Sequence, residues 1–431
     1  MPGKTPTYGT YYERREIMER ESFFPMSRFV SKEPVSLIPK CGACGLYKRC
    51  QTPKMKVSGG GKKKILIVGE APGSEEDRKG IQFVGKTGQH LRDTLRSFNI
   101  DMRVDCHITN TLICRPPRNE TPTDAQIDYC LPNLRKTIEE LKPVLIIPLG
   151  SVAVKAVLSL AWKDAPGGIT EWAGWRIPCQ KWNAWICPTY HPSFVTRSDD
   201  ERNPIPSLFF ERHLERGSRL TRRPWKTLPN YQDSVERFYE PPGAARVIRQ
   251  MISKRGILAF DFETDRLKPD HPDARIVSCS ICWNGKKTIA YPFRGEAVNA
   301  TREMILSPLP KIGAINKFEN RWCMKILKAR VRNFYWDCCV GQHMADNRRG
   351  ITSVKFQAFA RLGFSAYNAH IEPFLESVED GSNSPNRIDE IDLHELLTYN
   401  AIDSLVEYKI AMLQMREIGY PLPNLKGTKH G

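Results

Sequence analysis

The sequence predicts an α/β protein made of two domains. From about residue 30 to 215, strand-like and helical segments alternate, which is the order expected of a parallel sheet flanked by helices. A polar stretch rich in Arg and Pro follows at 212–243, and the strand-like GILAFDFETD at 256–265 then opens a second α/β unit. We therefore expect two folded modules joined by a basic linker.

The first domain is expected to contain seven segments. In chain order they are 64–70, 91–100, 104–112, 125–142, 143–150, 151–160 and 184–192. The second domain opens with the strand at 256–265 and closes with the helical segment 392–417. The expected boundaries are an N-terminal arm at 1–35, a first domain at 36–215, a linker at 216–245, a second domain at 246–418 and a C-terminal tail at 419–431.

Composition narrows the class of protein. The chain has 431 residues, 40% of them hydrophobic, which is enough for two or three separate cores. We find no run of about 18 apolar residues, and the start of the chain is too charged for a signal peptide, so we expect a cytoplasmic protein without a membrane span. Its 13 cysteines should then stay reduced. The net charge of +17 favours a polyanionic partner such as nucleic acid, although a basic protein without one remains the alternative.

A glycine-rich turn at 69–88 follows the first strand. Its sequence, GEAPGSEEDRKGIQFVGKTG, lacks the G-x-x-x-x-G-K-[ST] pattern of a phosphate-binding loop. Its carboxylates would repel the phosphates of a nucleotide. The turn therefore serves some other ligand.

Four cysteines have the spacing of a metal site. Cys41 and Cys44 form a C-x2-C pair, and Cys114 and Cys130 follow with fifteen residues between them. Four thiolates can hold a structural zinc ion or an iron–sulfur cluster, and spacing alone does not choose between them. Cys50 competes for the third position, and some of these residues could be ordinary buried cysteines.

Five motifs together resemble one family. CGAC, GEAPGSEED, GIQFVGKTGQHL, ITNTLICRPPRNETP and CPTYHPSF occur in the order seen in the iron–sulfur family 4 uracil-DNA glycosylases, over roughly residues 38–212. The resemblance implies an α/β/α sandwich and a [4Fe–4S] cluster held by Cys41, Cys44, Cys114 and Cys130. It also implies DNA as the substrate.

The same resemblance implies roles for five residues. Glu70 would position water or stabilise a cationic sugar, and Phe83 would stack on the uracil ring. Asn110 would read the edge of the base through one donor and one acceptor. His191 would donate to the uracil O2, and Glu76 falls where the family excludes the thymine methyl group.

Activity of this domain is not assured by the motifs. Ala71 stands where better-known glycosylases have a catalytic Asp, but family 4 shares this feature. A domain that has lost catalysis and serves as a DNA-binding platform is the alternative.

A set of carboxylates marks the second domain. On a strand, Asp261 and Glu263 project to one face, and on a helix Tyr399 and Asp403 also share a face. Glu319 lies between them in the chain. Such a cluster needs cations, and two Mg²⁺ or Mn²⁺ ions suit attack on a phosphodiester.

These residues resemble the DEDD-type 3′–5′ exonucleases that proofread for DNA polymerases, in the form with a Tyr in the last motif. The match covers roughly 245–415 and implies a ribonuclease H-like fold with a mixed sheet. It implies Asp261, Glu263, Glu319 and Asp403 as metal ligands, with Tyr399 orienting water. The middle motif departs from the family, because Glu319 replaces Asp and Asn316 is shifted by one. Asp337 and Asp346 are further candidate ligands.

The two resemblances together predict a DNA replication or repair factor. It would remove uracil or a related pyrimidine and digest DNA from 3′ ends. The arrangement is similar to the front portion of certain phage family A DNA polymerases. We expect a cytoplasmic protein, in the host cytoplasm if it is phage-encoded, that acts with a separate DNA polymerase. The alternatives are an exonuclease whose first domain only binds DNA or a partner, and a zinc-stabilised nuclease acting on RNA.

Overall fold

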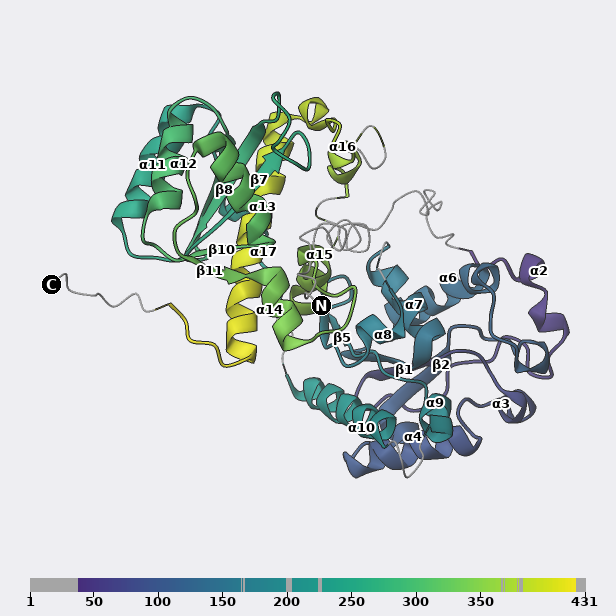
Figure 1. The fold of residues 1–431 in the computed structure, drawn as a ribbon. Coiled ribbons are helices and arrows are strands. Elements are labelled where there is room, and N and C mark those ends of the chain that lie inside the picture. Colours follow the sequence, from purple (N-terminus) through teal and green to yellow (C-terminus); the bar gives the residue numbers. More distant parts are fainter. Residues whose placement is uncertain are drawn as a thin grey trace, which may run out of the picture. The chain divides into compact units, whose positions relative to one another are not determined.

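The computed structural model describes residues 38–423, except 164, 166, 199–203, 224–226, 366, 368, 378 and 380–382. The predicted arm at 1–35 and most of the predicted tail therefore lie outside the described residues. The chain divides into two units: unit 1 is Met1–Thr227 with Phe359–Phe364, and unit 2 is Leu228–Ala358 with Ser365–Gly431 (Figure 1).

Unit 1 is built on a five-stranded sheet in the order β2-β1-β3-β5-β4. The strands are β1 (Ile65–Gly69), β2 (Cys106–Asn110), β3 (Leu145–Pro148), β4 (Ile177–Cys179) and β5 (Ala184–Ile186). All neighbours are parallel except β4, which runs antiparallel to β5. Every residue of β1 is buried, which is typical of a central strand covered on both faces.

Helices of unit 1 surround this sheet. They are α2 (Cys41–Cys44), α3 (Ser74–Lys79), α4 (Lys86–Ser97), α5 (Met102–Asp105), α6 (Asp124–Leu141), α7 (Gly150–Ala161), α8 (Ile169–Trp172), α9 (Pro192–Ser198) and α10 (Ile205–Ser218). Leu91 and Leu95 of α4 and Phe210 of α10 share one core with β1 and β3, while α7 contacts the same two strands. Thr123 begins α6 with a capping box formed with Gln126.

Unit 2 contains a six-stranded mixed sheet in the order β11-β10-β7-β8-β9-β6. The strands are β6 (Val235–Arg237), β7 (Leu258–Thr264), β8 (Ile276–Trp283), β9 (Lys287–Pro292), β10 (Lys311–Gly313) and β11 (Phe334–Asp337). The antiparallel β7, β8 and β9 are continued by β10 and β11, which run parallel to β7. This is the ribonuclease H-like order, so the predicted fold class is confirmed for both units.

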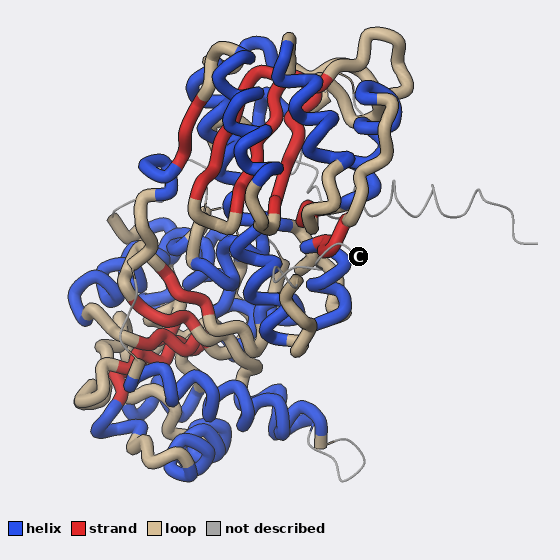
Figure 2. The backbone as a smooth tube through the Cα atoms, turned by 90° about the vertical axis from the view of Figure 1, so that its left-hand side faces the viewer, coloured by secondary structure: helices blue, strands red, loops and turns tan. Residues whose placement is uncertain are grey.

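Helices cover the sheet of unit 2, as the tube view of Figure 2 shows. They are α11 (Pro241–Ser253), α12 (Glu296–Leu306), α13 (Asn316–Trp322), α14 (Cys338–Ala345), α15 (Val354–Gln357), α16 (Glu372–Leu375) and α17 (Leu393–Glu417). α11 and α12 lie side by side and share a core with β7, β8 and β9. The long helix α17 packs on β7, β8 and β9 as well, and it carries the last motif to the strand that carries the first.

The segment 216–245, predicted to be a linker, contains regular structure. The end of α10 is followed by the 3-10 turns η4 (Arg219–Arg222) and η5 (Tyr231–Ser234), and then by β6 and the start of α11. β6 pairs with β9 and so forms an edge of the second sheet. No helix within the described residues has the length and apolar character needed to span a membrane.

Candidate functional site

In unit 1, the predicted site residues Phe83 and Asn110 converge over Gly69 at the carboxyl ends of β1 and β2. Gly69 and Asn110 are paired across the two parallel strands. A Cβ atom on Gly69 would lie 2.3 Å from Asn110 Oδ1 and 2.8 Å from Phe83 Cζ, so both side chains approach over this glycine. Asn110 is 4% exposed and Phe83 7% exposed. The first strand therefore needs Gly at its end to bring an amide beside an aromatic ring.

Phe83 is held in an unfavourable backbone conformation. Its φ is 53°, in the left-handed region that non-glycine residues avoid at a cost of roughly 1–3 kcal/mol. Its carbonyl accepts hydrogen bonds from Arg92 Nη1 at 2.5 Å and from Arg103 Nη2 at 3.4 Å. A Cβ on Gly88 would lie 2.0 Å from this carbonyl oxygen. The surrounding residues thus fix the ring, as expected of a binding element.

His191 is a neutral imidazole with a defined proton position. The backbone N–H of Ser193 donates to Nδ1 at 3.2 Å, and the Ser193 hydroxyl lies 2.7 Å from the same atom. Because an N–H can only donate, Nδ1 is the acceptor and Nε2 carries the proton. Burial lowers the pKa of His191 to about 4. The ring lies 6.2 Å from that of Phe83, so it offers a neutral N–H donor beside the aromatic face.

The carboxylates of the glycine-rich turn have different positions. Glu70 follows β1 and is half-buried, and burial raises its pKa. Glu76 Oε1 accepts from the N–H groups of Val84 and Gly85 at 3.0 and 3.2 Å. The buried Asp77 accepts from backbone N–H groups of the 51–52 segment. Glu76 and Asp77 therefore fix the conformation of nearby backbone by accepting its hydrogen bonds. The sequence did not predict this role.

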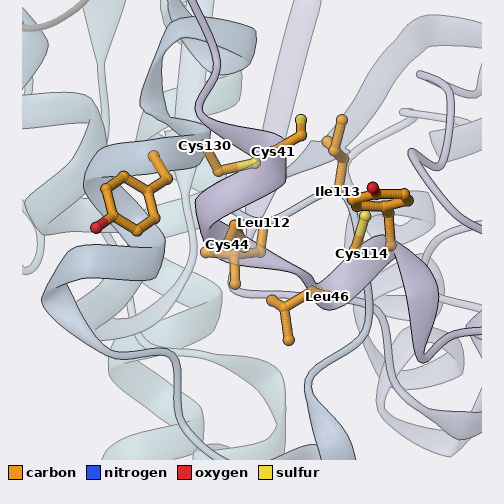
Figure 3. Close-up of a pocket in the computed structure, with 9 residues that line it drawn as sticks. Cys41, Cys44, Leu46, Leu112, Ile113, Cys114 and Cys130 are labelled. Carbon is orange, nitrogen blue, oxygen red and sulfur yellow. The ribbon is translucent and has the colours of Figure 1, made fainter.

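The four predicted cysteines line one small pocket (Figure 3). Cys41 and Cys44 lie on α2, Cys130 lies on α6, and Cys114 follows β2. The remaining lining residues are Leu46, Tyr47, Leu112, Ile113 and Tyr129. The apolar walls and four sulfur donors fit a thiolate-bound metal group.

Burial favours the neutral form of two of the four thiols. It raises the pKa of Cys114 to about 12 and also raises that of Cys130. A bound metal cation would favour the thiolate form of both residues.

In unit 2, the predicted carboxylates of β7 and α17 meet. Asp261, Glu263 and Asp403 each offer an oxygen, and these oxygens lie within 4.8 Å of one another. Burial raises the pKa of all three, and Asp403 raises the pKa of Asp261 further. Tyr399 is 5% exposed and lies one turn before Asp403 on α17. Three carboxylates this close suit oxygen-binding divalent ions.

Glu319 lies in the same cluster despite its altered motif. It is 2% exposed on α13, its Oε2 has no hydrogen-bond partner within the described part of the chain, and its pKa is raised by burial and by Asp261. Asp337, in contrast, accepts four backbone N–H bonds, from Ile315, Asn316, Cys339 and Val340. Asp346 is paired with Arg348 at 2.6 Å. Of the two further candidate acids, Asp337 therefore binds backbone N–H groups and Asp346 pairs with an arginine.

Sequence reasoning missed several residues around this cluster. Asn400 Nδ2 donates to Asp261 Oδ2 at 2.8 Å, and the Tyr367 hydroxyl donates to Asp403 Oδ1 at 2.5 Å. The Tyr367 ring stacks on Tyr399 with centroids 6.2 Å apart. Asn400 could have been found from its place inside YNAID, but Tyr367 lies in a segment without a recognisable pattern.

Comparison with known proteins identifies the family of unit 1. Residues 58–214 match the Uracil DNA glycosylase superfamily. The type-4 uracil-DNA glycosylase of Pyrobaculum aerophilum is 37% identical over 186 residues, which are 42% of this chain and 93% of that protein. The chain therefore belongs, through unit 1, to the type-4 uracil-DNA glycosylase family.

Two further similarities involve replication and nuclease proteins. A DNA polymerase of Bacillus phage SP01 is 27% identical over 209 residues, covering 45% of this chain and 21% of the polymerase. The structure of Escherichia coli RNase D, an exoribonuclease, aligns with a TM-score of 0.30 at 9% identity, over 43% of this chain and 45% of that one. The chain thus joins a glycosylase-like domain to a second α/β domain, whose chemistry must be argued from its own carboxylates.

Proposed function

We propose that this protein is a DNA replication or repair factor that excises uracil, or a related pyrimidine, and digests DNA from 3′ ends in a metal-dependent reaction. The observation that carries the proposal is the presence of two complete constellations in one chain. Gly69, Phe83, Asn110 and His191 converge in unit 1, and Asp261, Glu263 and Asp403 converge in unit 2.

Base excision follows from the groups in unit 1. Phe83 offers a stacking face worth ~1–3 kcal/mol per base, and the Asn110 amide pairs with the edge of uracil that cytosine presents in reverse. The proton on His191 Nε2 can be donated to the oxygen on which charge builds up as the base leaves. Glu70 stabilises the positive charge on the sugar or positions water, and Glu76 restricts the space beside the base.

We further propose that Cys41, Cys44, Cys114 and Cys130 hold a [4Fe–4S] cluster that stabilises the loop after β2. Thr111 N–H and Leu112 N–H donate to the carbonyls of Gly69 and Glu70, so this loop ties the cysteine pocket to the base site. Anaerobically purified protein should be brown with about four irons. Zinc in stoichiometric amount without iron would contradict this assignment.

Exonuclease chemistry follows from the carboxylates of unit 2. Asp261, Glu263, Glu319 and Asp403 would hold two Mg²⁺ or Mn²⁺ ions, which would activate water and stabilise charge on the phosphodiester. Asn400 fixes the Asp261 carboxylate by its hydrogen bond. Tyr399 lies beside Asp403 and would orient the attacking water. A separate DNA polymerase is the proposed partner, on the strength of the phage polymerase that resembles part of this chain.

The direct test uses single-stranded oligonucleotides with and without uracil. Free uracil should be released with or without Mg²⁺, whereas mononucleotides should be released from the 3′ end only with Mg²⁺. If protein with an intact cluster left uracil, hydroxymethyluracil and hypoxanthine in place, unit 1 would be a binding platform. Degradation starting at the 5′ end would refute the exonuclease assignment.

A further inference from the structure

A fifth acid lies in the carboxylate cluster of unit 2, outside the four that the motifs supply. Glu407 follows Asp403 by one turn on α17 and is 3% exposed. Residues four apart on a helix share a face, so its side chain belongs to the face that carries Asp403. Its Oε2 has no hydrogen-bond partner in the described portion of the chain, which is also true of Glu319 Oε2.

The surroundings of Glu407 are acidic. Burial raises its pKa well above the usual range, and Asp261, Glu319, Asp403 and Asp337 raise it further, in that order. The Asp337 carboxylate accepts hydrogen bonds from four backbone N–H groups, so it does not compete with Glu407 for a cation. Glu319 and Glu407 therefore each have one buried oxygen without a hydrogen-bond partner among the described residues.

An ionised carboxylate without a partner is expensive to bury, and a second one beside it adds repulsion. A divalent cation would supply the missing interactions. The middle motif of this chain is irregular, with Glu319 in place of Asp and Asn316 shifted. An extra carboxylate from α17 would compensate for that irregularity.

We propose that Glu407 is a fifth carboxylate ligand of the divalent-ion site that contains Asp261, Glu263, Glu319 and Asp403, and that one of the two ions depends on it. This inference rests on the proposed exonuclease function of the same site. The added ligand lies four residues after Asp403, which is the last residue of the motif.

The test counts Mn²⁺ ions bound to the full chain from the loss of the free Mn²⁺ EPR signal. Wild type should bind two ions that Asp261→Ala loses. Glu407→Gln removes the charge and keeps the shape, so one ion should bind at least ~10-fold more weakly while the other is unchanged. Glu395→Gln is the matched control, because Glu395 is exposed on the same helix. It should bind both ions as wild type does.

A second variant separates ligation from a structural role. Glu407→Leu removes all oxygens, so it should lose the same ion while the metal-free protein melts at the wild-type temperature or higher, since a buried acid has been replaced by an apolar group. Wild-type binding of both ions in Glu407→Gln and Glu407→Leu would overturn the inference, and so would fewer than two tight ions in wild type. If the Glu407-dependent ion is present but no DNA is digested, the ligand assignment stands and the exonuclease function fails.

Discussion

The base site of unit 1 and the carboxylate site of unit 2 are stabilised in opposite ways. In unit 1 the polar groups have protein partners: His191 Nδ1 accepts from Ser193, and Glu76 accepts from Val84 and Gly85. In unit 2 the carboxylates mainly face one another, and Glu319 and Glu407 have buried oxygens without partners among the described residues. The first site is preorganised by the protein itself, whereas the second is incomplete without cations. Removal of divalent ions should therefore affect only the second site.

The largest expected effect is that of Asp261→Ala. Asp261 is placed to contact both ions, so we expect 3′–5′ digestion to fall by at least ~10³-fold, as for loss of a principal electrostatic element. Mononucleotide release from a 3′-labelled strand measures it, and uracil release should not change. Asp273→Ala is the control, because its side chain is 83% exposed. Digestion that persists in Asp261→Ala would show that another site cuts DNA.

The reciprocal change is Asn110→Ala. It removes the amide that reads the base edge, so uracil release should fall at least ~10²-fold, comparable to loss of one transition-state donor. Single-turnover uracil release is the measurement. Exonuclease activity and iron content should stay at wild-type levels, and a parallel loss of iron would mean that the change has disturbed the cysteine pocket instead.

A smaller effect is expected from the two stacked tyrosines. Tyr399→Phe should slow digestion roughly 10-fold, because it removes the hydrogen bond to the attacking water. Tyr367→Phe should slow it a few-fold, because it removes the hydrogen bond to Asp403. Both changes leave the ligands in place. The effect of Tyr399→Phe is measured as the digestion rate at saturating Mg²⁺. The effect of Tyr367→Phe is measured from the Mg²⁺ dependence of that rate, since Tyr367 orients Asp403. Tyr239→Phe, whose hydroxyl contacts His394, is the control. Equal rates in all three variants would remove both tyrosines from the site.

The smallest effect concerns pH in unit 1. Because the pKa of His191 is lowered to about 4, the imidazole stays neutral as the pH falls from 8 to 5, and uracil release should show no inflection near the ordinary histidine value of about 6.5. If uracil release falls at acidic pH, but at pH values above the usual pKa of a glutamate, the fall should come from protonation of Glu70, whose pKa is raised by burial. This fall should be absent in Glu70→Gln. An inflection near pH 6.5 that His191→Gln abolishes would contradict the neutral donor.

Much of both sites could be predicted from the sequence, because their residues stand in short motifs that local structure brings to one face. The pairs Asp261 with Glu263 and Tyr399 with Asp403 need only strand and helix periodicity. The supporting residues could not be predicted in this way. Glu76 binds the backbone of the nearby 84–85 segment, and Asp77 binds that of the more distant 51–52 segment. Tyr367 reaches Asp403 from an irregular segment, and Glu407 differs from a surface acid only by its burial.

The central claim is that one chain carries two chemistries, of which only the second needs divalent ions. The most direct measurement is EDTA addition during digestion of a 5′-labelled, uracil-containing single strand. We predict that shortening from the 3′ end stops at once, resumes when Mg²⁺ is restored in excess, and that alkali-sensitive sites at uracil accumulate at the same rate throughout. The claim would be contradicted if the strand kept shortening in EDTA. It would also be contradicted if EDTA stopped the formation of alkali-sensitive sites as well as the shortening.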